Sequence, residues 1–432
     1  MDRSERGSLP TSAAGRLTRM GVMGAGVLGR NALARLKKIG AGDERRRAID
    51  LETHEANAVR IFDAMTRMKG AFMKLGQMLS LQAHTLPEPY VRRLADLQWE
   101  APPMHATLMR LQFRNELGKN PEEVFESFER DAFAAASLGQ VHGARLKSGE
   151  RVAVKIQYPG IDRSIESDFA NLKAMLSTIR LSREQYGEVW EAVEEIRRHF
   201  SREVDYVQEA ETIDEFRRLL RDRDDVRIPR VHRDFSSRRV LTMERLEGRH
   251  LRDWLRAKPS QEIRDETATR LLDLFFRQAL DFALLHADPH PGNYLFMEGG
   301  RIGLLDFGCS KKFDRAFVEQ HKELFRIPVG DIATLERHAR FYEDSDPRRD
   351  EKRAALAEMQ RVDIAKYHED RPFDFGDAAH LREVIGGLQK LVRLGLTTPG
   401  FALYVRAKIG LYNLFHQMGA RVNCHKVLRR YV

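Results

Sequence analysis

Two short polar segments in the C-terminal half carry residue types that could hold a metal ion and a reacting group. The first runs from His286 to Asn293, with the sequence His-Ala-Asp-Pro-His-Pro-Gly-Asn, and thirteen residues after Asn293 comes Asp306-Phe307-Gly308. Mg²⁺ is a hard cation that prefers oxygen ligands, so the amide oxygen of Asn293 and the carboxylate of Asp306 can hold it against phosphate oxygens. The carboxylate of Asp288 can then orient an attacking hydroxyl or water.

The spacing of these residues matches two motifs of protein kinases. Asp288 and Asn293 are five residues apart, as in the loop H-R-D-L-x-x-x-N, and Asp306-Phe307-Gly308 is the D-F-G tripeptide. Either segment alone would be a weak signal. A chance occurrence of both motifs, with a strand-like run at 301–305 between them, is improbable. ATP and Mg²⁺ are therefore the predicted cofactors, with Asn293 and Asp306 as metal ligands and Asp288 as the catalytic carboxylate.

Two histidines flank Asp288 and could be a metal-binding pair. No third nitrogen or sulfur ligand lies near His286 and His290 in the sequence to complete a zinc site. We favour structural roles, with His286 anchoring the backbone of a tight loop and His290 as a loop or substrate-side contact.

Upstream, Val152-Ala153-Val154-Lys155 matches the strand motif V-A-I-K, whose lysine contacts the α- and β-phosphates of ATP. A lysine at a strand end is usually solvated, so Lys155 gains its role from the downstream loops. Glu203 and Glu209 both could pair with it, but six residues place them ~120° apart around a helix, so two lysines are required. The second candidate is Lys74, in Lys74-Leu75-Gly76-Gln77, which periodicity alone predicts to be an exposed helix lysine.

The segment that should cover the phosphates departs from protein kinases. Where those proteins have G-x-G-x-x-G, this chain has Ala134, Ala135, Ala136 and Ser137, so methyl groups occupy positions where the backbone must approach phosphate. No A-P-E follows Gly308, so the usual platform for a peptide substrate is missing. These two departures favour a small or lipid-like substrate, or ATP hydrolysis. A separate G-x-G-x-x-G at Gly24, Gly26 and Gly29 is not a dinucleotide site, since no apolar strand precedes it.

The hydrophobic pattern predicts the elements that must position these residues. Residues 53–83 and 104–117 have helical periodicity, and residues 263–285 predict a later helix. Short runs rich in β-branched and aromatic residues predict five strands of one antiparallel sheet, at 124–128, 138–145, 151–156, 228–232 and 239–243. We predict an α+β, two-lobed, protein-kinase-like fold, with a hinge at 244–248, Glu244 among the nucleotide contacts and the nucleotide between the lobes. The predicted parts are a basic segment at 1–52, a helical extension at 53–120, an N-lobe at 121–247 and a helical C-lobe at 248–432.

Composition limits the classes of function. The 432 residues are 42% hydrophobic and 32% charged, which excludes a mainly disordered chain. The chain has nine more Lys and Arg residues than Asp and Glu residues, and residues 1–50 account for six of these nine positive charges. That segment could bind anionic lipid or be a solvated helix, and without an aromatic-interleaved patch we expect no nucleic-acid partner. Two cysteines favour a reducing, cytoplasmic compartment, and the uncharged run at 20–29 is half the ~20 residues that span a bilayer.

Taken together, the motifs resemble those of the AarF/UbiB family of atypical protein-kinase-like proteins, from about residue 60 to the C terminus. The resemblance is carried by Lys74 to Gln77 (K-x-G-Q), Ala134 to Ser137, residues 152–160 (V-A-V-K-I-Q-Y-P-G), Glu203 and Asp205 (E-x-D), and the two C-terminal segments. It implies that Lys155 pairs with Glu209, and that Lys74 lies over the active site and pairs with Glu203. Some members carry C-terminal transmembrane helices, whereas residues 421–432 here are polar and basic.

That resemblance also implies ATPase activity, little protein-kinase activity in trans, and a role in ubiquinone or other prenyl-lipid metabolism at a membrane. We expect a nucleotide, a prenyl-lipid or quinone precursor and an anionic membrane surface as partners, with peripheral contact at the inner face, and a homodimer or biosynthetic complex as possible assemblies. The alternatives are a non-catalytic, ATP-dependent scaffold and, less favoured, a conventional Ser/Thr kinase.

Overall fold

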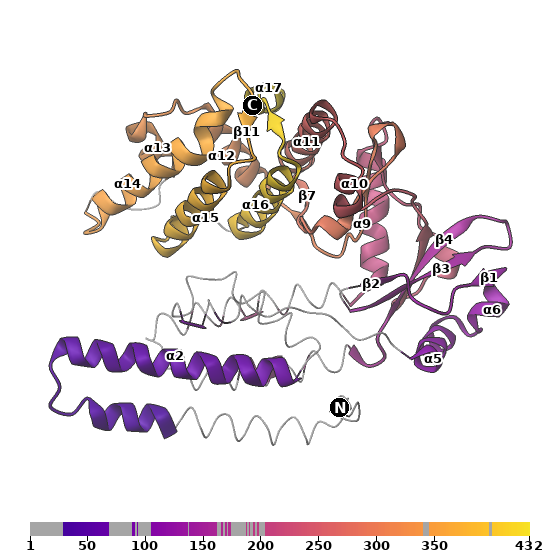
Figure 1. Ribbon diagram of the computed structural model, residues 1–432, viewed down its shortest axis with the longest axis horizontal. Coiled ribbons are helices and arrows are strands. Elements are labelled where there is room, and N and C mark those ends of the chain that lie inside the picture. The colour runs from indigo at the N-terminus through magenta and orange to yellow at the C-terminus, as the bar shows by residue number, and fades with distance from the viewer. Residues whose placement is uncertain are drawn as a thin grey trace. The chain divides into compact units, whose positions relative to one another are not determined.

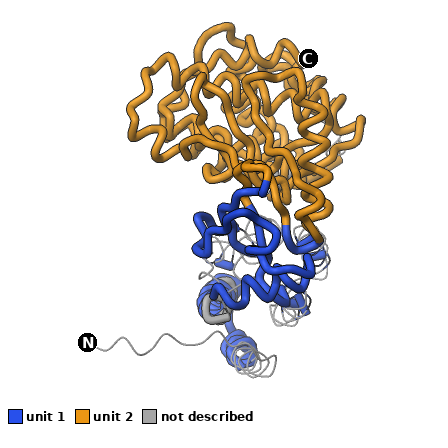
Figure 2. Tube along the Cα trace, turned by 90° about the vertical axis from the view of Figure 1, so that its right-hand side faces the viewer, with its two compact units in different colours: residues 1–147, 154–205, 238–240 blue, residues 148–153, 206–237, 241–432 orange. Residues whose placement is uncertain are grey.

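The structure is a computed structural model that describes residues 29–68, 89–90, 93, 105–136, 138–161, 204–339, 345–396 and 400–432, with single positions between 166 and 197. By its internal contacts the chain divides into two compact units, coloured in Figure 2. Unit 1 comprises residues 1–147, 154–205 and 238–240, and unit 2 comprises residues 148–153, 206–237 and 241–432. The domain boundaries expected from the sequence stay a prediction.

The described helices of unit 1 include α2 (Asp43–Met68), α5 (Ala106–Leu117) and α6 (Pro121–Val124) (Figure 1). Helix α5 begins at His105, whose Nδ1 accepts a hydrogen bond from the backbone N–H of Thr107, and ends at Gly118 in the left-handed conformation (φ 73°). Only glycine adopts that conformation without steric cost, so the sequence fixes where the helix ends.

A five-stranded sheet follows, formed by β1 (Ser127–Phe128), β2 (Ala134–Ala136), β3 (Gly139–Arg145), β4 (Arg151–Gln157) and β6 (Val240–Glu244). Its order is β1-β3-β4-β6, with β2 also paired to β3. Strand β2 is antiparallel to β3, and Ala136 is opposite Gly139. A side chain at Gly139 would collide with the backbone oxygen of Ile156, so glycine is required there.

Three of the expected elements need correction, one loop and two strands. The alanine-rich segment, expected as a loop, is strand β2. Residues 228–232, expected as a strand, form only an isolated bridge between Val231 and Met243, and Pro229 cannot donate to a ladder. Residues 121–124 form helix α6, because Pro121 starts it and Asn120 and Glu123 make a capping box, which shortens the expected strand at 124–128 to β1.

Unit 2 is mainly helical. Its helices are α9 (Tyr206–Leu219), α10 (Leu251–Arg256), α11 (Gln261–Phe276), α12 (Arg315–Arg326), α13 (Ile332–Ala339), α14 (Arg349–Met359), α15 (Ala378–Arg393), α16 (Phe401–Met418) and α17 (Cys424–Leu428). Its short strands are β5 (Val226–Arg227), β7 (Leu284–His286), β8 (Tyr294–Phe296), β9 (Ile302–Leu304), β10 (Ser310–Lys312), β11 (Phe373–Asp374) and β12 (Arg421–Val422). The helix expected at 263–285 instead ends at Phe276, and a π-helical turn at Arg277–Asp281 follows it.

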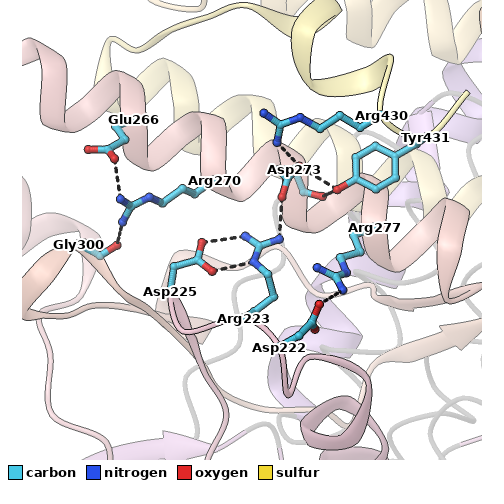
Figure 3. Close-up of polar contacts among 10 residues, drawn as sticks. All are labelled: Asp222, Arg223, Asp225, Glu266, Arg270, Asp273, Arg277, Gly300, Arg430 and Tyr431. Atoms are coloured by element: carbon cyan, nitrogen blue, oxygen red, sulfur yellow. Dashed lines mark hydrogen bonds and ion pairs between the residues drawn. The ribbon is translucent and has the colours of Figure 1, made fainter.

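An ionic network on α11 ties distant segments of unit 2 together (Figure 3). Its centre is Asp273, whose Oδ2 accepts from Arg223 at 2.6 Å and whose Oδ1 accepts from Arg430 at 3.0 Å and from the Tyr431 hydroxyl at 2.8 Å. Arg223 also forms two 2.7 Å hydrogen bonds to the carboxylate of Asp225. The network therefore joins α11 to the segment before β5 and to the last residues of the chain.

Candidate functional site

Two strand pairs hold the aspartate loop (residues 286–293) beside the D-F-G segment (residues 306–308). Strand β7 pairs with β10, with His286 opposite Ser310, and β8 pairs with β9, with Tyr294 opposite Leu304. Both ends of the aspartate loop are thus fixed to the ends of the chain segment that contains Asp306. Backbone hydrogen bonds from Ala287 to Cys309 (2.8 Å) and from Leu305 to Asn293 (2.9 Å) close the arrangement.

Asp288 and Asn293 interact directly inside this loop. The side-chain Nδ2 of Asn293 donates to Oδ2 of Asp288 at 2.8 Å, and Nη2 of Arg406 donates to Oδ1 of Asp288 at 3.1 Å. The Asp288 side chain keeps 25% of its surface exposed. Each carboxylate oxygen has two lone pairs, so Asp288 can accept a further hydrogen bond from a nucleophile.

Asp306 adopts a left-handed backbone conformation, with φ of 54°. This region is uncommon for residues other than glycine, though Asp and Asn enter it more readily than most, and it persists where surrounding contacts hold it. One such contact is the 3.3 Å hydrogen bond from the Gly308 N–H to Oδ1 of Asp306. The conformation and the contact fix the direction of the carboxylate.

The two histidines of the loop have structural contacts. The Nε2 of His286 lies 2.9 Å from the backbone oxygen of Asp306, and the His286 N–H donates to the side chain of Gln278 at 2.9 Å. His290 accepts a 3.1 Å hydrogen bond from Gly292 through Nδ1. Burial raises the pKa of the neighbouring Tyr294 well above its ordinary value, so this phenol stays neutral.

Helix α9 contacts the D-F-G segment through Glu209. The Glu209 Oε1 accepts a 3.3 Å hydrogen bond from the Phe307 N–H, and the Phe307 ring packs 5.2 Å from that of Phe216 on the same helix. Glu209 is 4% exposed, and Lys155 on β4 is 5% exposed. Lys155 belongs to unit 1 and Glu209 to unit 2, so their pairing stays a prediction.

Helix α16 packs against the aspartate loop, and the sequence analysis did not predict this contact. Arg406 and Gly410 are four residues apart, so they lie on one face of the helix. Arg406 binds Asp288, and a Cβ atom at Gly410 would collide with the ring of Pro289. The glycine therefore permits the close approach that lets Arg406 reach its partner. An isolated glycine inside a helical pattern often indicates close packing, so Gly410 was the one sequence signal for this contact.

The other predicted site residues have local contacts of their own. Ala134, Ala135 and Ala136 lie on β2, and Asp205 lies 3.5 Å from Arg238 in unit 1. The Glu244 carboxylate accepts from Arg227 at 2.8 Å and from the Arg230 N–H at 3.1 Å. Lys74, Gln77, Ser137 and Glu203 lie outside the described residues.

Comparisons with known proteins identify the family. A model of the ABC1 atypical kinase-like domain matches residues 96–331. The chain is 31% identical to the mitochondrial atypical kinase COQ8B of Rattus norvegicus, covering 99% of this chain and 82% of the relative. It is 30% identical to the mitochondrial atypical kinase COQ8 of Saccharomyces cerevisiae, and the match covers 99% of this chain and 86% of that relative. This chain belongs to the ABC1 (AarF/UbiB) atypical kinase-like family. The resemblance noted from the motifs is thus confirmed.

The fold of this chain is similar to that of a solved structure, the complex of Rv3197 with erythromycin from Mycobacterium tuberculosis. The TM-score is 0.58 at 24% identity, covering 90% of this chain and 98% of the other. The predicted α+β kinase-like fold is therefore confirmed. Among the described residues, no helix is long and apolar enough to cross a bilayer.

Proposed function

We propose that this ABC1 protein is an MgATP-dependent atypical kinase or ATPase that supports ubiquinone or other prenyl-lipid biosynthesis at a membrane surface. The supporting observation is that the aspartate loop and Asp306 are held side by side by two pairs of strands. The proposed roles follow the family: Asp288 orients the attacking group, Lys155 contacts phosphates, and Glu209 orients Lys155. The pairing of Lys74 with Glu203 in the K-x-G-Q extension belongs to the same proposal.

The donor atoms at the site fit magnesium. Because Asn293 uses Nδ2 to bind Asp288, its Oδ1 can serve as a metal ligand together with the carboxylate of Asp306. No group of three or more His, Cys, Asp or Glu side chains among the described residues has metal-binding geometry. Mg²⁺ is commonly held by one or two protein oxygens with phosphate oxygens and water, so two ligands suffice. Bound Mg²⁺ would neutralise charge on the β- and γ-phosphates.

Phosphate release from ATP, measured at steady state with and without anionic liposomes, tests this function. We expect Asp288→Asn to lower the rate at least about 100-fold, the order found when a catalytic acid–base group is lost. Asp306→Asn should lower it by a similar order, because a charged ligand of the metal is lost. Asp222→Asn, a change at an exposed residue of Figure 3, is the control and should leave the rate unchanged.

A non-catalytic scaffold is the second candidate. Its supporting observation is that both oxygens of Asp288 already accept hydrogen bonds, from Asn293 and Arg406. It predicts MgATP binding by calorimetry with the same background rate of phosphate release in wild type and Asp288→Asn. That result would contradict the enzymatic proposal.

A further inference from the structure

Helices α12 to α16 line a cavity within unit 2, and none of the residues of the aspartate loop contributes to it. Its volume is about 90 Å³, and nine of its fifteen lining side chains are Leu, Ile, Met or Phe. These helices form the orange-to-yellow part of the ribbon in Figure 1. Leu335 of α13, Leu356 of α14 and Leu391 of α15 supply parts of the wall. An apolar cavity of ~150 Å³ accepts benzene, so this smaller one suits a ligand with a short chain of a few carbon atoms.

One buried polar atom of the cavity wall lacks a partner. Among the described residues that line the cavity, only His321 has a buried side-chain nitrogen or oxygen without a hydrogen bond, its Nε2. His321 is 5% exposed, and its Nδ1 lies 2.9 Å from the backbone oxygen of Phe317. A carbonyl can only accept, so Nδ1 carries the proton and Nε2 presents a lone pair. A buried acceptor left unpaired is costly, which points to a donor from a ligand.

The imidazole is held in this orientation by its neighbours. Its ring stacks on Phe317 at 3.9 Å and lies 4.9 Å from the ring of Tyr404. Burial is the main reason that the pKa of His321 is lowered to about 4. The hydrogen bond to Phe317 opposes this shift, and the charges of Lys408 and His338 add to it. The ring is therefore neutral at physiological pH.

Two other polar side chains of the wall, Asp363 and Gln360, are hydrogen-bonded within the protein. Asp363 accepts from Lys366 at 2.9 Å and from Tyr412 at 3.0 Å, and it pairs with Lys408. Gln360 donates to Pro328 at 2.9 Å and accepts from Gly330 at 2.8 Å. The ammonium of Lys408 has three N–H groups, and its hydrogen bond to Asp363 uses one of them.

We propose that this cavity binds a small apolar molecule whose polar group is a single hydroxyl, which donates to Nε2 of His321 and accepts from Lys408. A water molecule at these two groups would leave the nine apolar side chains of the wall without a contact, whereas the apolar part of a larger molecule packs against them. A π-helical turn, Gln360–Ile364, supplies Gln360, Asp363 and Ile364 to the cavity, and such turns are frequent at functional sites. This proposal goes beyond the proposed ATPase and does not require it.

Two isomeric probes test the hydroxyl directly in the nucleotide-free full chain. 3-Fluoropropan-1-ol and 2-fluoroethyl methyl ether have the same atoms, but only the alcohol has a donor, and both can be titrated by ¹⁹F NMR. The methyl resonance of Met359, which lines the cavity, reports the binding site and is assigned with Met359→Leu. We expect the alcohol to shift this resonance and to bind about ten-fold more tightly than the ether.

Variants separate the acceptor from the cavity. In His321→Phe, which keeps the ring shape, the two probes should bind equally, and in Leu391→Trp, which fills the cavity, neither should shift Met359. In His338→Gln, a change at a half-buried lining residue bound to Glu323, the ten-fold preference should persist. Equal binding of the isomers to wild type, or an unshifted Met359 resonance, would overturn the proposal, whatever the ATPase assay gives.

Discussion

Asn293 donates a hydrogen bond from Nδ2 to Oδ2 of Asp288 at 2.8 Å, so one side-chain amide connects the proposed catalytic carboxylate to the proposed metal site. The amide has two functional ends, and the hydrogen bond occupies only the nitrogen end. The orientation of Asp288 and the binding of the metal should therefore depend on the same residue.

Replacing this amide should affect both properties. We expect Asn293→Ala to lower the rate of phosphate release at least about ten-fold and to raise the magnesium concentration needed for half the maximal rate. Asn423→Ala, at the N-cap of α17, is the control and should leave the magnesium dependence unchanged. A magnesium titration of Asn293→Ala that coincides with wild type would contradict the assignment.

A glycine-to-alanine pair tests the close approach of α16 to the aspartate loop. Alanine favours a helix by about 1 kcal/mol over glycine, and at Gly386 of α15, where a Cβ meets no atom within 4 Å, it should stabilise the protein by that order. At Gly410 the clash of the new methyl group with Pro289 should instead destabilise the protein. We expect the free energy of unfolding to fall by about 1–3 kcal/mol and phosphate release to be slower. Urea denaturation measures both variants. Equal stabilisation by the two changes would show that α16 does not press on the loop.

Glu209 offers a way to separate charge from backbone contact. Glu209→Gln keeps an oxygen that can accept from the Phe307 N–H but removes the charge that Lys155 is predicted to require. We expect weaker ATP binding in both Glu209→Gln and Glu209→Ala, but faster hydrogen exchange of the Phe307 amide in Glu209→Ala alone. Calorimetry and exchange by mass spectrometry give the two readouts. Unchanged ATP affinity in Glu209→Gln would mean that Lys155 has another partner.

The Asp273 network should contribute to stability. The Asp273 side chain is 12% exposed and binds Arg223, Arg430 and Tyr431, so Asp273→Ala removes one partner of the mostly buried Arg223 and the acceptor of the Tyr431 hydroxyl, and it should cost about 1–3 kcal/mol. Asp222, bound to Arg277, is 56% exposed, and Asp222→Ala should not change the urea midpoint. Similar midpoints for the two variants would argue against the network.

His321 should make the folding free energy depend on pH. Its pKa is about 4 in the folded protein and 6.5 ordinarily, so between these values the unfolded chain binds more protons. Stability should therefore fall as pH decreases from 6.5 towards 4, by a contribution on the order of 3 kcal/mol. The charged groups around the ring are Lys408, His338 and Asp363. Denaturation of wild type and His321→Phe at several pH values measures the contribution, and parallel curves would contradict it.

The sequence predicted the aspartate loop and the D-F-G segment because their chemistry is local. Asp288, Asn293 and Asp306 fall within 19 residues, and two strand pairs suffice to bring them together. Arg406 could not be found this way, since it lies 118 residues after Asp288 and its role depends on how α16 packs. Residue spacing carries no information about such packing.

The errors in the predicted elements have similar causes. The pattern at 228–232 suited a strand, but Pro229 lacks the N–H group that pairing requires. The alanines at 134–136 were expected as a loop from their position before Lys155, and alanine by propensity favours a helix, yet pairing with β3 makes them a strand. Tertiary pairing outweighed local preference in this case.

The π-helical turn at Arg277–Asp281 fixes the length of chain between α11 and the aspartate loop. The N–H of Phe282 donates to Arg277 at 3.0 Å, five residues earlier, and Gln278 within this turn binds the backbone of His286. Deleting one residue there would restore a regular helix and rotate everything that follows by about 100°. Homologous chains should therefore tolerate insertions and deletions in the surface turn at 297–301 but not between residues 277 and 286.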